Sequence, residues 1–130
     1  MLLKLLLVGA GGAIGSIGRY GVGLWSERIP GYGGFPFGTV IANLAGCLII
    51  GVVAGVMLAR PGALDSDARL FLVVGVLGGF TTFSAFGLDT LTLIRDQSAG
   101  AALLNVGLQV GIGLLAVWAG LSATESLLRS

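Results

Sequence analysis

The chain has 130 residues, of which 55% are hydrophobic and 10% charged, and its formal net charge is +1. Because soluble domains carry about a quarter charged residues, a mean hydropathy of +1.02 and so few charges predict an integral membrane protein. So small a net charge gives no reason to expect a nucleic-acid partner. The absence of histidine and the single cysteine, Cys47, exclude zinc sites, Cys–His nucleophiles and a disulfide framework within one chain. We therefore do not expect an enzyme.

The first apolar segment covers about residues 2–24 and has Lys4 near its start. Its beginning is similar to a secretory signal peptide, but Lys4 interrupts the apolar run and no hydrophilic mature domain follows. We expect a transmembrane helix instead. Arg19, near the end of this segment, either attracts anions to a vestibule or extends its side chain to the membrane interface.

Three further segments have the length of about 20 largely apolar residues that a bilayer-spanning helix needs: about 38–59, 70–94 and 99–121. Short polar connections separate the last three segments. Together the four predict an all-α integral membrane protein, with residues 1–130 forming a single four-helix transmembrane domain. Four crossings place both termini on one side of the membrane.

The third segment contains an unusual stretch for a lipid-facing helix, Gly78-Gly79-Phe80-Thr81-Thr82-Phe83-Ser84-Ala85-Phe86. Adjacent glycines loosen a helix, and hydroxyl groups satisfy backbone groups that a break sets free. Non-helical backbone at membrane depth is tolerated only where protein or a water-lined cavity shields it. The stretch predicts a broken third helix with exposed carbonyl groups near its centre.

Polar side chains recur at a spacing of four in two other segments. Thr39 and Asn43 share one helical face, and Asn105 and Gln109 repeat the pattern in the fourth segment. The two pairs are suited to lining a polar track without a full charge. The alternative for Asn43 is a hydrogen bond across a helix interface.

Aromatic rings and hydroxyls alternate after the predicted break. Phe83 and Phe86 lie three residues apart, and Thr82 and Ser84 flank Phe83. The edge of a phenyl ring is partially positive and hydroxyl groups donate hydrogen bonds, so the combination is suited to replacing the hydration shell of a small anion. The alternative is ordinary packing. Asp89 offers a carboxylate, which the sequence allows to pair with Arg19 or Arg95.

Glycines four residues apart occur in every segment and predict closely packed helices: Gly11 and Gly15, Gly51 and Gly55, Gly75 and Gly79, and Gly107 and Gly111. The basic residues divide almost evenly between the two sides of the membrane, with Lys4, Arg60, Arg69 and Arg129 opposing Arg28, Arg95 and Arg19. So flat a distribution gives little orientation by the positive-inside rule and favours insertion in both directions.

Three motifs together resemble the Fluc/CrcB fluoride channels in order, spacing and chain length: GGAIGSIGRY at residues 11–20, GTVIANLAG at 38–46 and GGFTTFS at 78–84. The third motif is the specific one, and the resemblance extends over all four segments. One departure is Ala85, which stands where the family often has threonine.

The resemblance implies an antiparallel dual-topology homodimer that encloses two fluoride pores. It also implies one structural sodium ion at the dimer centre, held by the backbone carbonyls of Gly78 and Thr81. The fluoride path would be lined by Phe83, Phe86 and Asn43, and by the further polar residues Thr39, Thr82, Ser84, Asn105 and Gln109, with Arg19 in the vestibule.

The expected function is passive, selective export of fluoride through the prokaryotic plasma (inner) membrane, which protects against fluoride toxicity. The expected partners are fluoride, a second copy of the chain and membrane lipid. The alternative is a small multidrug-type dual-topology exporter, although such proteins use a membrane-embedded glutamate that the first segment lacks. A third reading, a subunit of a membrane assembly that transports nothing, explains the glycines but not the polar residues.

Overall fold

The computed structural model describes residues 1–29, 33–96 and 98–129, and the regular structure within them is entirely helical. Four helical spans are long and apolar enough to cross a membrane: Leu2–Ser26, Phe37–Ala59, Ser66–Asp96 and Ala99–Arg129. The first two are single helices, α1 and α2. The predicted class, an all-α multi-pass membrane protein with four spanning helices, is confirmed.

The third span is built from four pieces: α3 (Ser66–Arg69), η1 (Leu70–Leu77), α4 (Gly78–Phe80) and α5 (Phe83–Asp96). It begins at Asp65, whose carboxylate accepts a hydrogen bond of 2.7 Å from the backbone N–H of Ala68 and so caps the helix. The helix stops at Thr81, which is extended with φ −90° and ψ 158°. The predicted break in the third helix is confirmed.

The fourth span is continuous but changes its winding. It comprises α6 (Ala99–Val106), η2 (Gly107–Ile112) and α7 (Gly113–Arg129), and both η1 and η2 are π-helical. The hydroxyl of Ser98 caps α6 by accepting a bond of 3.2 Å from the N–H of Ala101. Because π turns are rare and often mark functional sites, the wide turns beside the break single out the centre of the protein.

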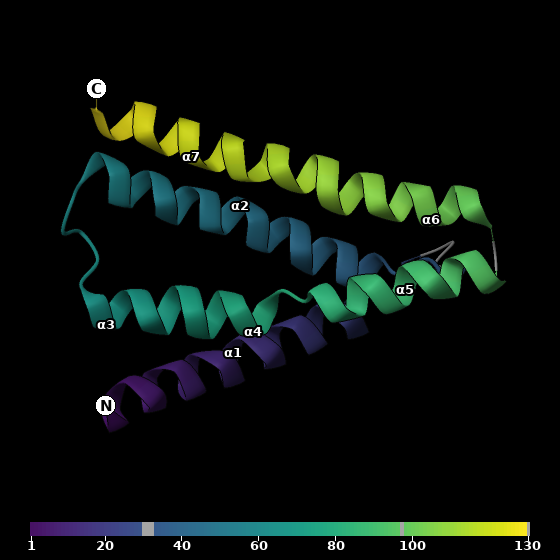
Figure 1. The fold of residues 1–130 in the computed structure, drawn as a ribbon, viewed down its shortest axis with the longest axis horizontal. Coiled ribbons are helices and arrows are strands. Elements are labelled where there is room, and N and C mark those ends of the chain that lie inside the picture. The colour runs from purple at the N-terminus through teal and green to yellow at the C-terminus, as the bar shows by residue number, and fades with distance from the viewer. Residues whose placement is uncertain (30–32, 97, 130) are drawn as a thin grey trace.

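Figure 1 shows how the spans lie side by side. The fourth span runs along α2, the first half of the third span runs along α1, and both termini lie at the same end of the bundle. This arrangement leaves α2 between the fourth span and the broken third span. The break therefore faces α2, which carries Asn43.

Glycines bring the paired helices into close contact. A Cβ atom on Gly11 would lie 2.5 Å from the carbonyl oxygen of Phe71, and one on Gly79 would lie 2.5 Å from that of Gly12. Between α2 and α7, a Cβ atom on Gly120 would lie 2.5 Å from the carbonyl oxygen of Leu48. No larger residue fits these positions without moving a helix backbone.

The predicted glycine contacts hold for three of the four pairs. Around Gly107 and Gly111 no atom lies within 4 Å of an added Cβ, so the prediction of close packing is wrong for this pair within the protomer. The fourth span uses Gly113 and Gly120 instead. The reason is the helix phase, because η2 winds more widely than the α-helix on which the spacing rule rests.

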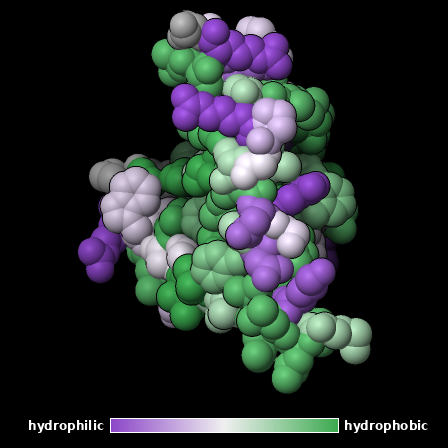
Figure 2. Space-filling view, turned by 90° about the vertical axis from the view of Figure 1, so that its left-hand side faces the viewer, coloured by the Kyte–Doolittle hydropathy of each residue, from purple (hydrophilic) through white to green (hydrophobic). Residues whose placement is uncertain are grey.

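The interior is small and the outer surface is largely apolar, as expected where lipid replaces water. Large side chains on the outside include Ile17, Leu88, Leu103 and Trp118, each more than 60% exposed. Figure 2 shows the end of the bundle that carries both termini, where hydrophilic groups gather among apolar ones.

Candidate functional site

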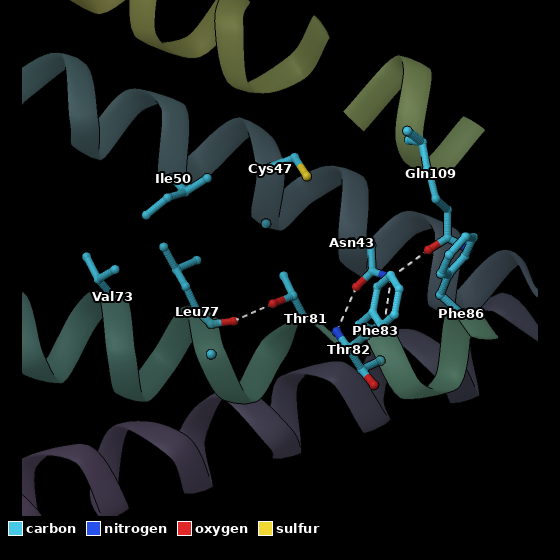
Figure 3. Close-up of a pocket in the computed structure, with 13 residues that line it drawn as sticks. Asn43, Cys47, Ile50, Val73, Leu77, Thr81, Thr82, Phe83, Phe86 and Gln109 are labelled. Atoms are coloured by element: carbon cyan, nitrogen blue, oxygen red, sulfur yellow. Dashed lines mark hydrogen bonds between the residues drawn. The ribbon is translucent and has the colours of Figure 1, made fainter. Parts of the chain in front are cut away.

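Asn43 of α2 bridges the break in the third span. Its Oδ1 accepts a hydrogen bond of 2.8 Å from the backbone N–H of Thr82, and its Nδ2 donates one of 3.0 Å to the carbonyl of the same residue. The same Nδ2 donates a second bond, of 2.5 Å, to Oε1 of Gln109 in η2. Figure 3 shows this amide between the break and the fourth span. Asn43 thus does for the broken backbone what a neighbouring helical turn would otherwise do.

The chain of hydrogen bonds continues through the fourth span. Nε2 of Gln109 donates to Oδ1 of Asn105 at 2.8 Å, and Nδ2 of Asn105 donates to the hydroxyl of Thr90 at 2.9 Å. That hydroxyl donates to the carbonyl of Phe86 at 2.7 Å. Asn105 is completely buried. We call Asn43, Gln109, Asn105 and Thr90 the amide relay.

The break separates the carbonyl groups of Gly78 and Thr81, among others, from their helical donors. In an unbroken helix the N–H of Thr82 would bond the carbonyl of Gly78, and the N–H of Ala85 would bond that of Thr81. Here the first N–H is bonded to Asn43, and the second donates to the hydroxyl of Thr82 at 3.2 Å. The carbonyls of Gly78 and Thr81 therefore lose the donors that a continuous helix would give them.

Two neighbouring carbonyls at the break, those of Gly79 and Leu77, have partners. The carbonyl of Gly79 accepts a hydrogen bond of 3.2 Å from Nε of Arg19 and one of 3.5 Å from the hydroxyl of Ser16, and both donors belong to α1. The carbonyl of Leu77 accepts from both the N–H and the hydroxyl of Thr81, at 3.0 Å and 2.9 Å. Protein groups therefore hold the break from both sides.

A cavity of about 440 Å³ lies beside the break, between α2, the two halves of the third span and η2. It brings together most of the residues predicted for the pore and the cation site, namely Asn43, Thr82, Phe83, Phe86, Gln109, Gly78 and Thr81. The rings of Phe83 and Phe86 have centroids 5.5 Å apart at an interplanar angle of 50°. Phe83 is 83% exposed in the single chain.

A second cavity, of about 260 Å³, lies on the α1 side of the break and is lined by Arg19, Thr39, Thr82 and Asp89, among others. Thr82 borders both cavities. Oδ2 of Asp89 is buried and has no hydrogen-bond partner among the described residues. In this part of the chain Asp89 forms no ion pair with Arg19 or Arg95, the partners that the sequence allowed.

Two residues predicted for the pore line neither cavity. Asn105 is buried behind Gln109, and Ser84 is exposed, with its hydroxyl 3.2 Å from that of Thr82. Sequence reasoning missed Thr90, which joins Asn105 to α5. The signal for Thr90 was its position four residues after Phe86, on the same helical face.

Comparison with known proteins agrees with this geometry. The family model described as CrcB-like protein, Camphor Resistance (CrcB), matches residues 6–121. The chain belongs to the CrcB family. The match covers the break and every member of the amide relay, so the whole site lies within the part of the chain that the family model matches.

Several relatives of nearly the same length have names that state a function. The chain is 44% identical over 123 residues to the "Fluoride-specific ion channel FluC" of Rhizobium meliloti, which covers 95% of this chain and 97% of the relative. Its identity to proteins of the same name is 45% over 117 residues in Thermus thermophilus, covering 90% of each, and 45% over 118 residues in a Caulobacter species, covering 91% of each.

Proposed function

We propose that this CrcB-family chain is a fluoride-selective ion channel that passively exports fluoride across the prokaryotic plasma membrane. The observation that carries the proposal is the cavity at the break, where phenylalanine rings lie beside amide and hydroxyl groups without a fixed charge. Relatives that are about 44% identical over most of their length are named fluoride-specific channels. The function expected from the sequence is therefore also the one that the site supports best.

Fluoride enters such a pore only if donors compensate for the water it loses. Gln109 uses one Nε2 hydrogen on Asn105, and because an amide nitrogen carries two hydrogens, the second is available to an anion. The hydroxyls of Thr82 and Ser84 add further donors, and the edges of Phe83 and Phe86 add partial positive charge. All these groups are neutral, so the anion is solvated without being trapped by a full charge.

The cavity beyond Thr82 supplies the vestibule. Arg19 lines it and carries a full positive charge, and its Nε donates a hydrogen bond to the carbonyl of Gly79. The guanidinium gives an anion one positive group in this cavity, whose lining also includes the carboxylates of Glu27 and Asp89. Thr39 lies in the same cavity and adds a hydroxyl to its wall.

The working unit in this proposal is an antiparallel homodimer. The phenylalanine most exposed in the single chain, Phe83, lies at the cavity, so a second copy would cover it. The even distribution of basic residues favours insertion in both orientations. Two copies would also bring two pairs of free carbonyls, those of Gly78 and Thr81, to one centre.

Carbonyl oxygens are ligands that suit hard cations, and the two released carbonyls belong to residues that line one cavity. Their residues therefore fit the structural sodium site that the family resemblance implies. When bound, sodium supplies positive charge and holds the two broken helices together. In this proposal Gly78 and Thr81 contribute only backbone oxygens, so side-chain substitutions there act through the backbone.

The alternative, a small multidrug-type exporter, is not favoured. The first span, Leu2–Ser26, contains no acidic residue, whereas that class uses a glutamate in its first helix. A resistance test with quaternary ammonium compounds separates the two functions. Cells that express the chain should gain no resistance to these cations.

Fluoride efflux from liposomes tests the proposal directly. Vesicles loaded with potassium fluoride and containing the purified protein should release fluoride when valinomycin supplies a path for potassium. Vesicles without protein are the control. Retention of fluoride at the level of the control would refute the proposed function.

A labelling experiment tests the dual topology. A single cysteine placed at the C-terminus of a Cys47→Ser chain should react with an impermeant reagent from both sides of the membrane, about half from each. Labelling from one side alone would refute the antiparallel arrangement while leaving the conduction result untouched.

A further inference from the structure

The side chain of Asn43 has little left to offer an anion, because its two amide hydrogens are already engaged. One goes to the carbonyl of Thr82 and the other to Oε1 of Gln109, while its own oxygen accepts from the N–H of Thr82. An amide has two hydrogens to donate. The geometry therefore gives Asn43 a structural task at the break.

The contact between Asn43 and the N–H of Thr82 affects the carbonyl groups that are suited to a cation. By holding the N–H of Thr82, Asn43 prevents this group from bonding the carbonyl of Gly78, as a continuous helix would require. If Asn43 moved away, the N–H would be free to return to Gly78 and close the break. The position of one amide thus decides whether the Gly78 carbonyl is available.

Asn43 is itself held from the fourth span. Gln109 accepts its second hydrogen and in turn donates to Asn105, which is completely buried and lines neither cavity at the break. Asn105 donates to Thr90 of α5. All four bonds from Asn43 to the Phe86 carbonyl run in one donor direction, so the relay has a single consistent arrangement.

We propose that Asn105, Gln109 and Thr90 are positioning residues that fix Asn43 against the break and thereby set the affinity of the Gly78 and Thr81 carbonyls for a cation. This proposal rests on the proposed channel function, because it deepens the role of the same site. It assigns Asn105 to the support of the cation site rather than to the wall of the pore. Buried side-chain networks of this kind act as a unit, since losing one member leaves another polar group unpaired.

The variant Thr90→Val tests the relay with almost no change of volume. It removes the hydroxyl that accepts from Asn105 and donates to Phe86. The matched control is Thr92→Val, the same substitution two residues later at an exposed position of the same helix. A second variant, Asn105→Leu, removes the centre of the relay, and Thr90→Val decides the outcome if that variant fails to fold.

The first measurement is hydrogen exchange of the Thr82 backbone N–H in detergent, without sodium or fluoride. We expect exchange at least several-fold faster in Thr90→Val than in the wild type, and unchanged exchange in Thr92→Val. The second is the sodium concentration that gives half of the thermal stabilisation by sodium. We expect it to rise several-fold in Thr90→Val and to stay constant in the control.

Unchanged exchange and unchanged sodium dependence in Thr90→Val would overturn the proposal. A lower fluoride efflux in Thr90→Val, with unchanged Thr82 exchange and unchanged sodium dependence, would also overturn it. That result would indicate that the relay residues act on the pore itself. A different pattern is expected if the relay proposal is right but the chain is not a fluoride channel. The wild type would then release no fluoride, while hydrogen exchange of the Thr82 N–H would still be faster in Thr90→Val.

Discussion

Replacing Asn43 with leucine should destabilise the fold by about 2 to 4 kcal/mol. The substitution keeps a side chain of similar size but removes three hydrogen bonds, of 3.0, 2.8 and 2.5 Å. Each such bond contributes about 0.5 to 1.5 kcal/mol, and two of the three satisfy backbone groups of Thr82. Measurements in membrane proteins average near 0.6 kcal/mol per bond, or about 1.8 kcal/mol for three bonds, which favours the lower end of this range.

The assay is unfolding of the purified protein by sodium dodecyl sulfate in mixed micelles, followed by circular dichroism. Leu58→Ala is the control, because Leu58 is 54% exposed near the end of the same helix, α2. We expect the Asn43→Leu midpoint to fall clearly below that of the control. A loss below about 1 kcal/mol, similar to ordinary surface substitutions, would refute the view that Asn43 holds the break.

Three further predictions concern packing, pore and vestibule. Gly120→Ala should reduce the folded fraction in size-exclusion chromatography, because its Cβ would lie 2.5 Å from the carbonyl of Leu48, whereas Gly107→Ala should fold normally; equal yields would contradict the packing. Phe83→Ile should lower fluoride efflux without changing elution volume, because a ring edge is lost, and unchanged efflux would remove Phe83 from the pore. Arg19→Gln should lower efflux most at low ionic strength, since salt screens the charge; the same deficit at every salt concentration would argue against a steering role.

The break was predictable because its causes are local. Gly78, Gly79 and the following hydroxyls mark it in the sequence, and the structure places the end of α4 at Phe80. The bond from the N–H of Ala85 to the hydroxyl of Thr82 is likewise short in range. Features that depend on a few neighbouring residues are thus within reach of sequence reasoning.

The partners of the break were not predictable, because they depend on how helices meet. Asn43 and Thr82 are 39 positions apart, and Asn43 and Gln109 are 66 apart. The spacing of Asn105 and Gln109 placed both on one face, but it did not show that only Gln109 reaches the cavity. In segments that are almost entirely apolar, polar residues are too few to show a helical period. The sequence therefore does not distinguish the π turns of η1 and η2 from α turns.

The central claim is selective conduction of fluoride, and the most direct test is the reversal potential of the purified protein in a planar lipid bilayer. One chamber contains potassium fluoride, and the other contains potassium chloride at the same concentration. The account predicts a reversal potential far from zero, with the sign expected for a fluoride current. A reversal potential near zero, at which fluoride and chloride carry current equally, would contradict it.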